Sequence, residues 1–155
     1  MSEGWLIQKN IVIIGGTGGM GLSAAKAFVA QGARVVVVGR NSQTCDAAQQ
    51  QLGEKGVAIC ADAIDPSAAE NAINICVQQF GTFHGLYHVA GGSGRKMGDG
   101  PLHELTLAGW NKTFELNLTS LMLSNQAAIK WLLKHKTGGS ILNMSSVLCM
   151  SPSPG

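Results

Sequence analysis

The chain has 155 residues, of which 45% are hydrophobic, and a formal net charge of +2 from 11 basic and 9 acidic side chains. This length and this hydrophobic content fit one domain with a real core. The balanced charge argues against a nucleic-acid partner and a polybasic membrane patch, and no apolar run approaches the roughly 20 residues of a membrane span.

The start of the chain and its cysteines indicate where the protein works. Residues 1–5 lack the basic and apolar regions of a signal peptide. The cysteines are widely spaced and form no Cys-x-x-Cys motif: Cys45, Cys60, Cys76 and Cys149. We therefore expect reduced, partly buried thiols in a cytoplasmic protein.

Apolar runs alternate with segments of helical periodicity along the chain. The runs that predict strands are Asn10–Ile14, Arg34–Val38, Gly56–Cys60, Gly85–Val89 and Ser140–Met144. The segments that predict helices are Gly19–Gln31, Ser42–Leu52, Pro66–Gln79 and Leu107–His135. This alternation predicts an α/β fold, a Rossmann-type doubly wound parallel sheet with helices on both faces.

Local signals predict where helices begin and end. Asp65 is a candidate N-cap, followed by Pro66 in the first turn. Gly32 and the pair Gly138-Gly139 are expected to end helices, because glycine adopts the left-handed conformation of a C-cap.

The most informative segment is the glycine turn, Gly15–Gly21, between the first strand and the first helix. Free backbone N–H groups and the helix dipole make such a junction an anion site, and glycine lets a pyrophosphate approach the backbone. The spacing Gly15-x-x-x-Gly19-x-Gly21 resembles the glycine motif of the short-chain dehydrogenase/reductase family, with Ile14 in place of the usual threonine. The resemblance implies that a nicotinamide dinucleotide contacts Gly15, Thr17, Gly18, Gly19, Met20 and Gly21. An ordinary strand-to-helix turn is the alternative.

The predicted topology indicates the same place without reference to a family. Ligands of doubly wound sheets bind beyond the carboxyl ends of the strands, where the winding reverses. The first and fourth strands flank that point, and the loops that follow them, Gly15–Gly21 and Ala90–Pro101, are the richest in glycine.

Two residues after the second and third strands bear on the choice of cofactor. Gly39 leaves no acidic residue at the end of the second strand, and Arg40 supplies a positive charge that can pair with a 2′-phosphate. This favours NADP(H), with NAD(H) as the alternative. Asp62, followed by Ala63, resembles the family's aspartate that binds the adenine amino group; an ordinary turn aspartate is the other interpretation.

The fourth strand ends in His88-Val89-Ala90-Gly91, where the family has Asn-Asn-Ala-Gly. The resemblance implies that Ala90, Gly91 and Gly92 lie against the cofactor. We expect His88 to be a structural hydrogen-bonding residue beside the sheet rather than a catalytic base, and His84 to lie at the surface.

The helix predicted over Leu107–His135 has two apolar faces and an unusual interior asparagine, Asn117. One face contains Trp110, Phe114, Leu118 and Leu121, and the other contains Leu116, Leu123 and Ala127. By resemblance, Asn117 holds a water in a proton relay, and the long helix packs against its copy in a homodimer or homotetramer. An ordinary polar position is the alternative for Asn117.

The fifth strand ends in Ser145-Ser146, which resembles the family's Gly-x-Ile-x-x-x-Ser-Ser segment. Ser146 matches the catalytic serine, whose hydroxyl holds the substrate oxygen. The family's Tyr-x-x-x-Lys pair is not found in the printed residues, and the sole tyrosine, Tyr87, does not match it. We therefore expect residues 1–155 to be a single NAD(P)-binding domain without the C-terminal strands of the full fold.

The resemblance implies an NAD(P)(H)-dependent oxidoreductase that transfers hydride reversibly between the nicotinamide and a small carbonyl or alcohol substrate. No metal site is expected. A non-catalytic nucleotide-binding or interaction module is the alternative. A flavodoxin-like or methyltransferase-type domain is disfavoured by the matches at Ala90-Gly91 and Ser145-Ser146.

Overall fold

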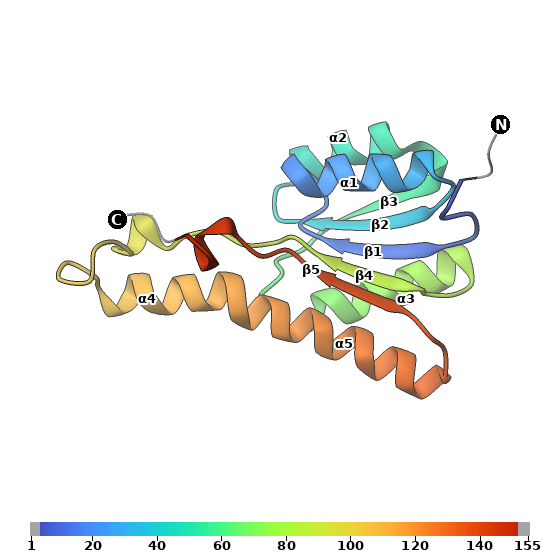
Figure 1. Ribbon diagram of the computed structural model, residues 1–155. Helices are drawn as coiled ribbons and strands as arrows, with labels where there is room; N and C mark the ends of the chain where they lie inside the picture. Colours follow the sequence, from blue (N-terminus) through green and yellow to red (C-terminus); the bar gives the residue numbers. More distant parts are fainter. Residues whose placement is uncertain (1–3, 152–155) are drawn as a thin grey trace.

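A parallel sheet of five strands forms the centre of the fold in the computed structural model, which describes residues 4–151 (Figure 1). The strands are β1 (Asn10–Ile14), β2 (Arg34–Gly39), β3 (Gly56–Cys60), β4 (Gly85–His88) and β5 (Ser140–Asn143). They lie in the order β3-β2-β1-β4-β5, so the winding reverses between β1 and β4. The predicted fold class is confirmed, with strand ends shifted by one residue: β2 is longer, and β4 and β5 are shorter, than predicted.

Helices cover both faces of the sheet. They are α1 (Gly19–Ala30), α2 (Ser42–Leu52), α3 (Ala68–Phe80), α4 (Leu107–Phe114) and α5 (Ser120–His135). Short 3₁₀ turns lie at Gly53–Lys55, Arg95–Met97 and Val147–Cys149. In Figure 1, α1 and α2 lie on one face, and α3 and α5 on the other. The helix predicted over Leu107–His135 is interrupted by a π-helical segment, Glu115–Thr119, which joins α4 to α5.

The core consists of two apolar layers, one on each side of the sheet. The run Val35–Val38 is at most 1% exposed, because alternate residues of β2 enter opposite layers. On the side of α5, the residues nearest the sheet are small: Ser120, Ser124 and Ala128 are buried at four-residue spacing. Small side chains at this spacing let the helix lie close to β4.

The C-terminus of α5 corrects one expectation from the sequence. The left-handed residue is Lys136, with φ 52°, and not one of the two glycines that follow. Gly139 is required for packing instead, because a Cβ there would lie 2.8 Å from a Leu132 methyl carbon and 2.9 Å from the His84 carbonyl oxygen. Gly32 does end its helix as expected, with φ 93°.

The start of α3 also differs from the prediction. The helix begins at Ala68, with Ser67 at the N-cap position. The carboxylate of Asp65 accepts hydrogen bonds from the Ser67 amide at 2.8 Å and from the Ser67 hydroxyl at 2.9 Å. It therefore closes a turn ahead of the helix rather than capping the helix itself.

Two surfaces, a sheet edge and an apolar helix face, are not covered within residues 4–151. β5 is at the edge of the sheet, and three of its four residues are exposed. A stripe along α4 and α5 is also exposed and consists of Trp110, Phe114, Leu118, Met122, Ile129 and Leu133. Part of the first predicted apolar face therefore faces away from the sheet.

A buried polar cluster closes the sheet at the amino end of β1. Asn10 is fully buried, and its side-chain amide donates to the Phe80 and Thr82 carbonyls at 3.1 and 2.8 Å. Its backbone N–H donates to His84 Nδ1 at 3.0 Å. His84 is partly exposed, which agrees with its expected surface position, although its ring also accepts a hydrogen bond from the buried cluster. Desolvation, reinforced by the charges of Lys9 and Arg34, lowers the pKa of His84 below 6.5.

We expect the free energy of unfolding to fall as the pH drops from about 7 to about 5. The unfolded chain binds a proton at His84 near the ordinary pKa of 6.5, whereas the folded chain resists it because its pKa is lowered. The contribution of His84 to the free energy of unfolding is therefore present in full well above pH 6.5, and it is lost as the pH falls below 6.5. His84→Asn should reduce the pH dependence, because an amide oxygen can accept the Asn10 N–H without titrating. Urea unfolding at a series of pH values measures the effect.

The variant His84→Ala is the control for the hydrogen bond itself. It leaves the Asn10 N–H without its acceptor and should lower stability at every pH. Some pH dependence should remain in His84→Asn, because burial also lowers the pKa of His88. A pH profile identical to that of the original chain would show that His84 does not contribute.

Candidate functional site

A cavity of about 330 Å³ lies where the winding of the sheet reverses, at the carboxyl ends of the strands. All of the predicted cofactor-binding residues except Gly19 and Gly92 line it: Gly15, Thr17, Gly18, Met20, Gly21, Arg40, Asp62, Ala63, Ala90 and Gly91. The structure therefore brings together the four loops that follow β1, β2, β3 and β4. The sequence analysis missed Leu116 and Ser120, which enter the same lining from the other side of the sheet.

The glycine turn packs too tightly for side chains at three of its positions, Gly15, Gly16 and Gly21. Gly15 has φ 86°, and a Cβ there would lie 2.6 Å from the Ala90 backbone nitrogen. A Cβ on Gly21 would overlap the Gly15 carbonyl oxygen. Glycine at these positions therefore lets β1, the start of α1 and the loop after β4 come into contact.

The other two glycines of the turn, Gly18 and Gly19, face open space. A Cβ on Gly18 or Gly19 would meet no atom within 4 Å, and Gly19 has φ 50°. Gly18 is the N-cap of α1 and, being a glycine, has no side chain that could cap the free N–H groups of the helix. The first turn of α1 contains no acidic residue. The amino end of α1 thus combines open space with an uncompensated positive helix dipole, which suits a phosphate group.

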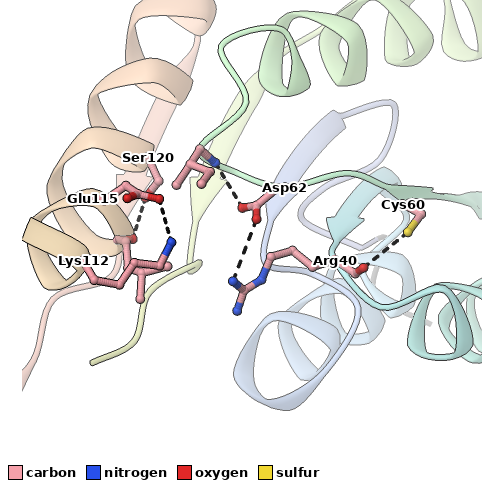
Figure 2. A network of polar contacts seen from close by, with 8 residues as sticks. Arg40, Cys60, Asp62, Lys112, Glu115 and Ser120 are labelled. Carbon is pink, nitrogen blue, oxygen red and sulfur yellow. Dashed lines mark hydrogen bonds and ion pairs between the residues drawn. The ribbon is translucent and has the colours of Figure 1, made fainter. Parts of the chain in front are cut away.

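Arg40 and Asp62 form the charged rim of the cavity (Figure 2). Their closest side-chain atoms, Arg40 Nη1 and Asp62 Oδ2, are 3.9 Å apart, and the side chains are 59% and 39% exposed. The other carboxylate oxygen of Asp62 accepts the Ile64 N–H at 3.2 Å. The aspartate therefore closes a turn, as the plainer interpretation of the sequence expected, and also presents a carboxylate to the cavity.

Thr17 connects this rim to the glycine turn. It is 8% exposed, and its hydroxyl is 3.2 Å from that of Thr44 on α2. A Cβ on Gly39 would overlap the Thr17 hydroxyl, so glycine at the end of β2 is required for this contact. The absence of an acidic side chain at Gly39 therefore has a packing cause in addition to any role in cofactor choice.

Asn117 holds the loop after β4. Its side-chain oxygen accepts the Gly92 N–H at 3.0 Å, and its side-chain nitrogen donates to the Gly92 carbonyl. The same nitrogen donates to the Thr113 carbonyl at 2.8 Å. Both Asn117 and Gly92 lie beside the cavity rather than in its lining. Because Gly91 does line it, Asn117 positions one wall of the cavity through the backbone.

The π-helical segment brings Ser120 to the cavity. The Ser120 N–H donates to the Glu115 carbonyl, five residues back, instead of to that of Leu116. The Ser120 hydroxyl donates a hydrogen bond to the Leu116 carbonyl at 2.6 Å (Figure 2). The wider turn also holds a 2.7 Å ion pair between Lys112 and Glu115. Such π-segments occur often at functional sites.

His88 lies behind Ser120 and is 1% exposed. Its Nδ1 is 2.8 Å from the Ser124 hydroxyl, and its Nε2 is 3.4 Å from the Ser120 hydroxyl. Burial lowers the pKa of His88, and a hydrogen bond with the Ala90 backbone partly offsets this. The expected hydrogen-bonding role beside the sheet is confirmed by these contacts.

Ser146 lies beyond the end of β5, at the same edge of the sheet as the cavity but outside its lining. It is exposed, and its hydroxyl oxygen accepts the Leu148 N–H at 3.2 Å as the N-cap of a 3₁₀ turn. The structure therefore does not bring Ser146 and Asn117 into contact.

The donor set fits a dinucleotide rather than a metal ion. The open glycines at the amino end of α1 can receive a pyrophosphate, and Arg40 and Asp62 lie at the end of β2 and β3 where a ribose and a base can be bound. Within residues 4–151, no cluster of three or more His, Cys, Asp or Glu side chains could hold a metal ion. No helix in the same range is long and apolar enough to cross a membrane.

Solved structures of known proteins share this fold. A short chain dehydrogenase from Bacillus anthracis matches with a TM-score of 0.85 and 26% identity, over 96% of this chain and 59% of its own. A short-chain dehydrogenase/reductase from Mycobacterium ulcerans matches with the same score and identity, over 96% of this chain and 55% of its own.

Sequence comparisons give the same result. A dehydrogenase of 2,5-dichloro-2,5-cyclohexadiene-1,4-diol from Sphingobium indicum is 33% identical over 97% of this chain and 59% of its own length. A 3-alpha-(or 20-beta)-hydroxysteroid dehydrogenase from Mycobacterium tuberculosis is 31% identical over 94% of this chain and 54% of its own. The chain thus spans somewhat more than half the length of these relatives. The short chain dehydrogenase family model matches residues 9–155, and the chain belongs to that family.

Proposed function

We propose that this chain is the cofactor-binding part of an oxidoreductase that transfers hydride reversibly between a nicotinamide dinucleotide and a carbonyl or alcohol carbon. The observation that carries the proposal is the glycine turn at the amino end of α1, open at Gly18 and Gly19 and held against Ala90. The bound dinucleotide supplies the hydride donor or acceptor. The residues of this chain bind and orient it.

The cavity divides the binding task between its walls. Gly15, Gly18, Gly19, Met20 and Gly21 would receive the pyrophosphate, with Thr17 beside them. Asp62 and Ala63 would bind the adenine. The loop Ala90–Gly92 would lie along the nicotinamide half, in a position fixed by Asn117. Asn117 lies in the π-helical segment and hydrogen-bonds the backbone of Gly92 in this loop, which supports its role as a positioning residue for the reaction.

The preference for NADP(H) over NAD(H) rests on Arg40. Its guanidinium group is more than half exposed at the cavity rim and can pair with a 2′-phosphate. The carboxylate of Asp62 at 3.9 Å compensates part of that charge, so NAD(H) is the second candidate.

Ser146 is our candidate for the group that holds the substrate oxygen. Its position beyond β5, at the carboxyl edge of the sheet, supports this role. The relatives from Sphingobium and Mycobacterium act, by their names, on ring-bearing diols or steroids. We therefore infer that cyclic secondary alcohols and the corresponding ketones are the first substrates to try.

The exposed stripe on α4 and α5 supports self-association, and we propose a homodimer or homotetramer through residues 107–135. The free thiols of the described cysteines support a cytoplasmic location.

The other candidate is a non-catalytic nucleotide-binding or interaction module. The specific observation in its favour is that the printed sequence contains one tyrosine, Tyr87, which is buried in β4. The two candidates differ in turnover and not in cofactor binding, so both quantities have to be measured.

Gly19→Ala should weaken dinucleotide binding about tenfold or more, because its methyl group enters the space that the phosphates need. Isothermal titration calorimetry with NADP(H) measures this. Gly53→Ala is a matched control: Gly53 has φ 58° and open space around it, but it ends α2 outside the cavity. Both glycines have a positive φ, so both variants strain the backbone, and only Gly19→Ala should lose affinity. Equal affinities in the two variants would exclude the glycine turn as the phosphate site.

Arg40→Ala should weaken NADP(H) binding about tenfold and leave NAD(H) binding nearly unchanged, because only NADP(H) has the 2′-phosphate. Asp62→Ala provides the contrast. It removes the acceptor proposed for the adenine amino group, which both cofactors share, and should weaken both alike. Titrations of both variants with both cofactors test this. Parallel losses of the two cofactors in Arg40→Ala would remove the argument for NADP(H).

Ser146→Ala should lower kcat about 100-fold in any protein that contains this chain and turns over, because it removes a hydrogen bond to the reacting oxygen. The neighbouring Ser145→Ala is the control and should retain most of the rate. NADPH oxidation with a panel of cyclic ketones measures both.

The 155 printed residues alone should bind cofactor without turnover. If they reduce ketones with the rate of longer family members, the division of labour proposed here is wrong.

A further inference from the structure

Two cysteines from different elements meet behind the charged rim of the cavity. Cys60 is the last residue of β3 and pairs in register with Gly39, the last residue of β2. Cys45 lies in the first turns of α2, which packs against β3. The Cys45 Sγ lies 3.5 Å from the carbonyl oxygen of Ile59, which precedes Cys60, and 3.5 Å from that of Gly39, so both thiols flank the same paired strand ends.

The environment differs between the two sulfur atoms. Cys60 is exposed, whereas Cys45 is 5% exposed and its Sγ donates weakly to the Gly39 and Ile59 carbonyls at 3.5 Å. Burial and the neighbouring Cys60 raise the pKa of Cys45. An oxidant from solution therefore reaches Cys60 first, and Cys45 is positioned behind it.

Both cysteines are connected to residues that line the cavity. The Cys60 thiol donates to the backbone carbonyl of Arg40 at 3.5 Å, and the Arg40 side chain extends from there toward Asp62 (Figure 2). Cys45 directly follows Thr44, whose hydroxyl contacts Thr17. A movement of either sulfur is thus transmitted to Arg40 or to Thr17.

We propose that Cys45 and Cys60 are a redox modification site, at which a peroxide forms a reversible disulfide that weakens cofactor binding at the rim formed by Arg40. The disulfide itself follows from the placement of the two thiols. Its effect on binding rests on the function proposed above.

The chemistry is a two-electron oxidation of the thiol pair. The Cys60 sulfur attacks one peroxide oxygen, the O–O bond breaks, and a sulfenic acid and one water form. The Cys45 sulfur then attacks the sulfenic sulfur, the S–O bond breaks, and a second water leaves with the thiol proton. Two thiols and one hydrogen peroxide become one disulfide and two waters. The proximity of the sulfurs raises their effective concentration, which offsets the raised pKa of Cys45. A dithiol reductant reverses the reaction.

The disulfide changes the rim in two ways. It removes the S–H donors, so the Arg40 carbonyl loses its contact with Cys60. It also draws the two sulfurs to a covalent separation of about 2.05 Å, which requires the start of α2 and the end of β3 to approach each other. Both changes displace the segment that bears Arg40 and Thr44.

The first experiment maps the modification in the intact chain. The protein is treated with hydrogen peroxide, its remaining thiols are alkylated, and the digest is analysed by mass spectrometry without reduction. We expect a peptide that links Cys45 to Cys60 within one chain and disappears after reduction with dithiothreitol. Cys149→Ser is the control for the other exposed thiol and should give the same linked peptide. Alkylation of Cys45 and Cys60 as separate thiols, oxidation of Cys60 without linkage, or links only between chains would overturn the proposal.

The second experiment measures the consequence for binding. Calorimetry should show that the oxidised chain binds NADP(H) about fivefold or more weakly than the reduced chain. Cys60→Ser retains an O–H donor for the Arg40 carbonyl and should bind equally well before and after peroxide. A linked peptide with unchanged affinity would overturn the coupling to the rim. If the reduced chain binds no dinucleotide, the proposed function fails and the coupling fails with it, whereas the peptide masses still decide the disulfide.

Discussion

The close contact of three backbones at the end of β1 is the constraint on which the rest of the structure depends. A Cβ on Gly21 would overlap the Gly15 carbonyl oxygen, and a Cβ on Gly15 would lie 2.6 Å from the Ala90 nitrogen in the loop after β4. Any side chain at Gly15 or Gly21 would separate the strand from the helix or from the neighbouring loop. The same contact places the amino end of α1 at the reversal of the winding, where an open sheet binds its ligands. Packing and binding therefore require the same glycines.

The far wall of the cavity depends on an irregular helix. A regular α-helix from Leu107 to His135 would use all of its i−4 carbonyls in the backbone ladder. The π-helical turn releases the Leu116 carbonyl, which accepts a hydrogen bond from the Ser120 hydroxyl, and the side-chain nitrogen of Asn117 donates to the Thr113 carbonyl. The same turn directs Leu116 and Ser120 into the cavity and Asn117 toward Gly92. The helix thus lacks some of its regular i−4 backbone hydrogen bonds, and the side chains of this turn instead make contacts that fix the loop after β4.

The rim of the cavity is less strongly fixed than its base. Arg40 and Asp62 are exposed at 59% and 39%, and a pair of this kind contributes little to stability, about 0–1 kcal/mol. Its charges are therefore available to a ligand at a low cost. The thiols of Cys45 and Cys60 lie directly behind this pair, next to backbone carbonyls of β2 and β3. A small displacement of α2 can therefore shift Arg40, because few strong contacts hold this side chain in place.

The sequence alone determined the order of the elements, the parallel sheet and most of the cavity lining, because hydrophobic periodicity and glycine spacing are local properties of the chain. It also indicated Asn117 through the cost of asparagine within a helix. It did not show Leu116 and Ser120 in the lining, because their orientation depends on a π-turn that no residue type specifies. Nor did it show that Arg40 pairs with Asp62 or that Cys45 lies beside the strand end that bears Cys60. Those contacts join ends of β2, β3 and α2 that are distant in sequence, and only the packing of the sheet and its helices decides which of them meet.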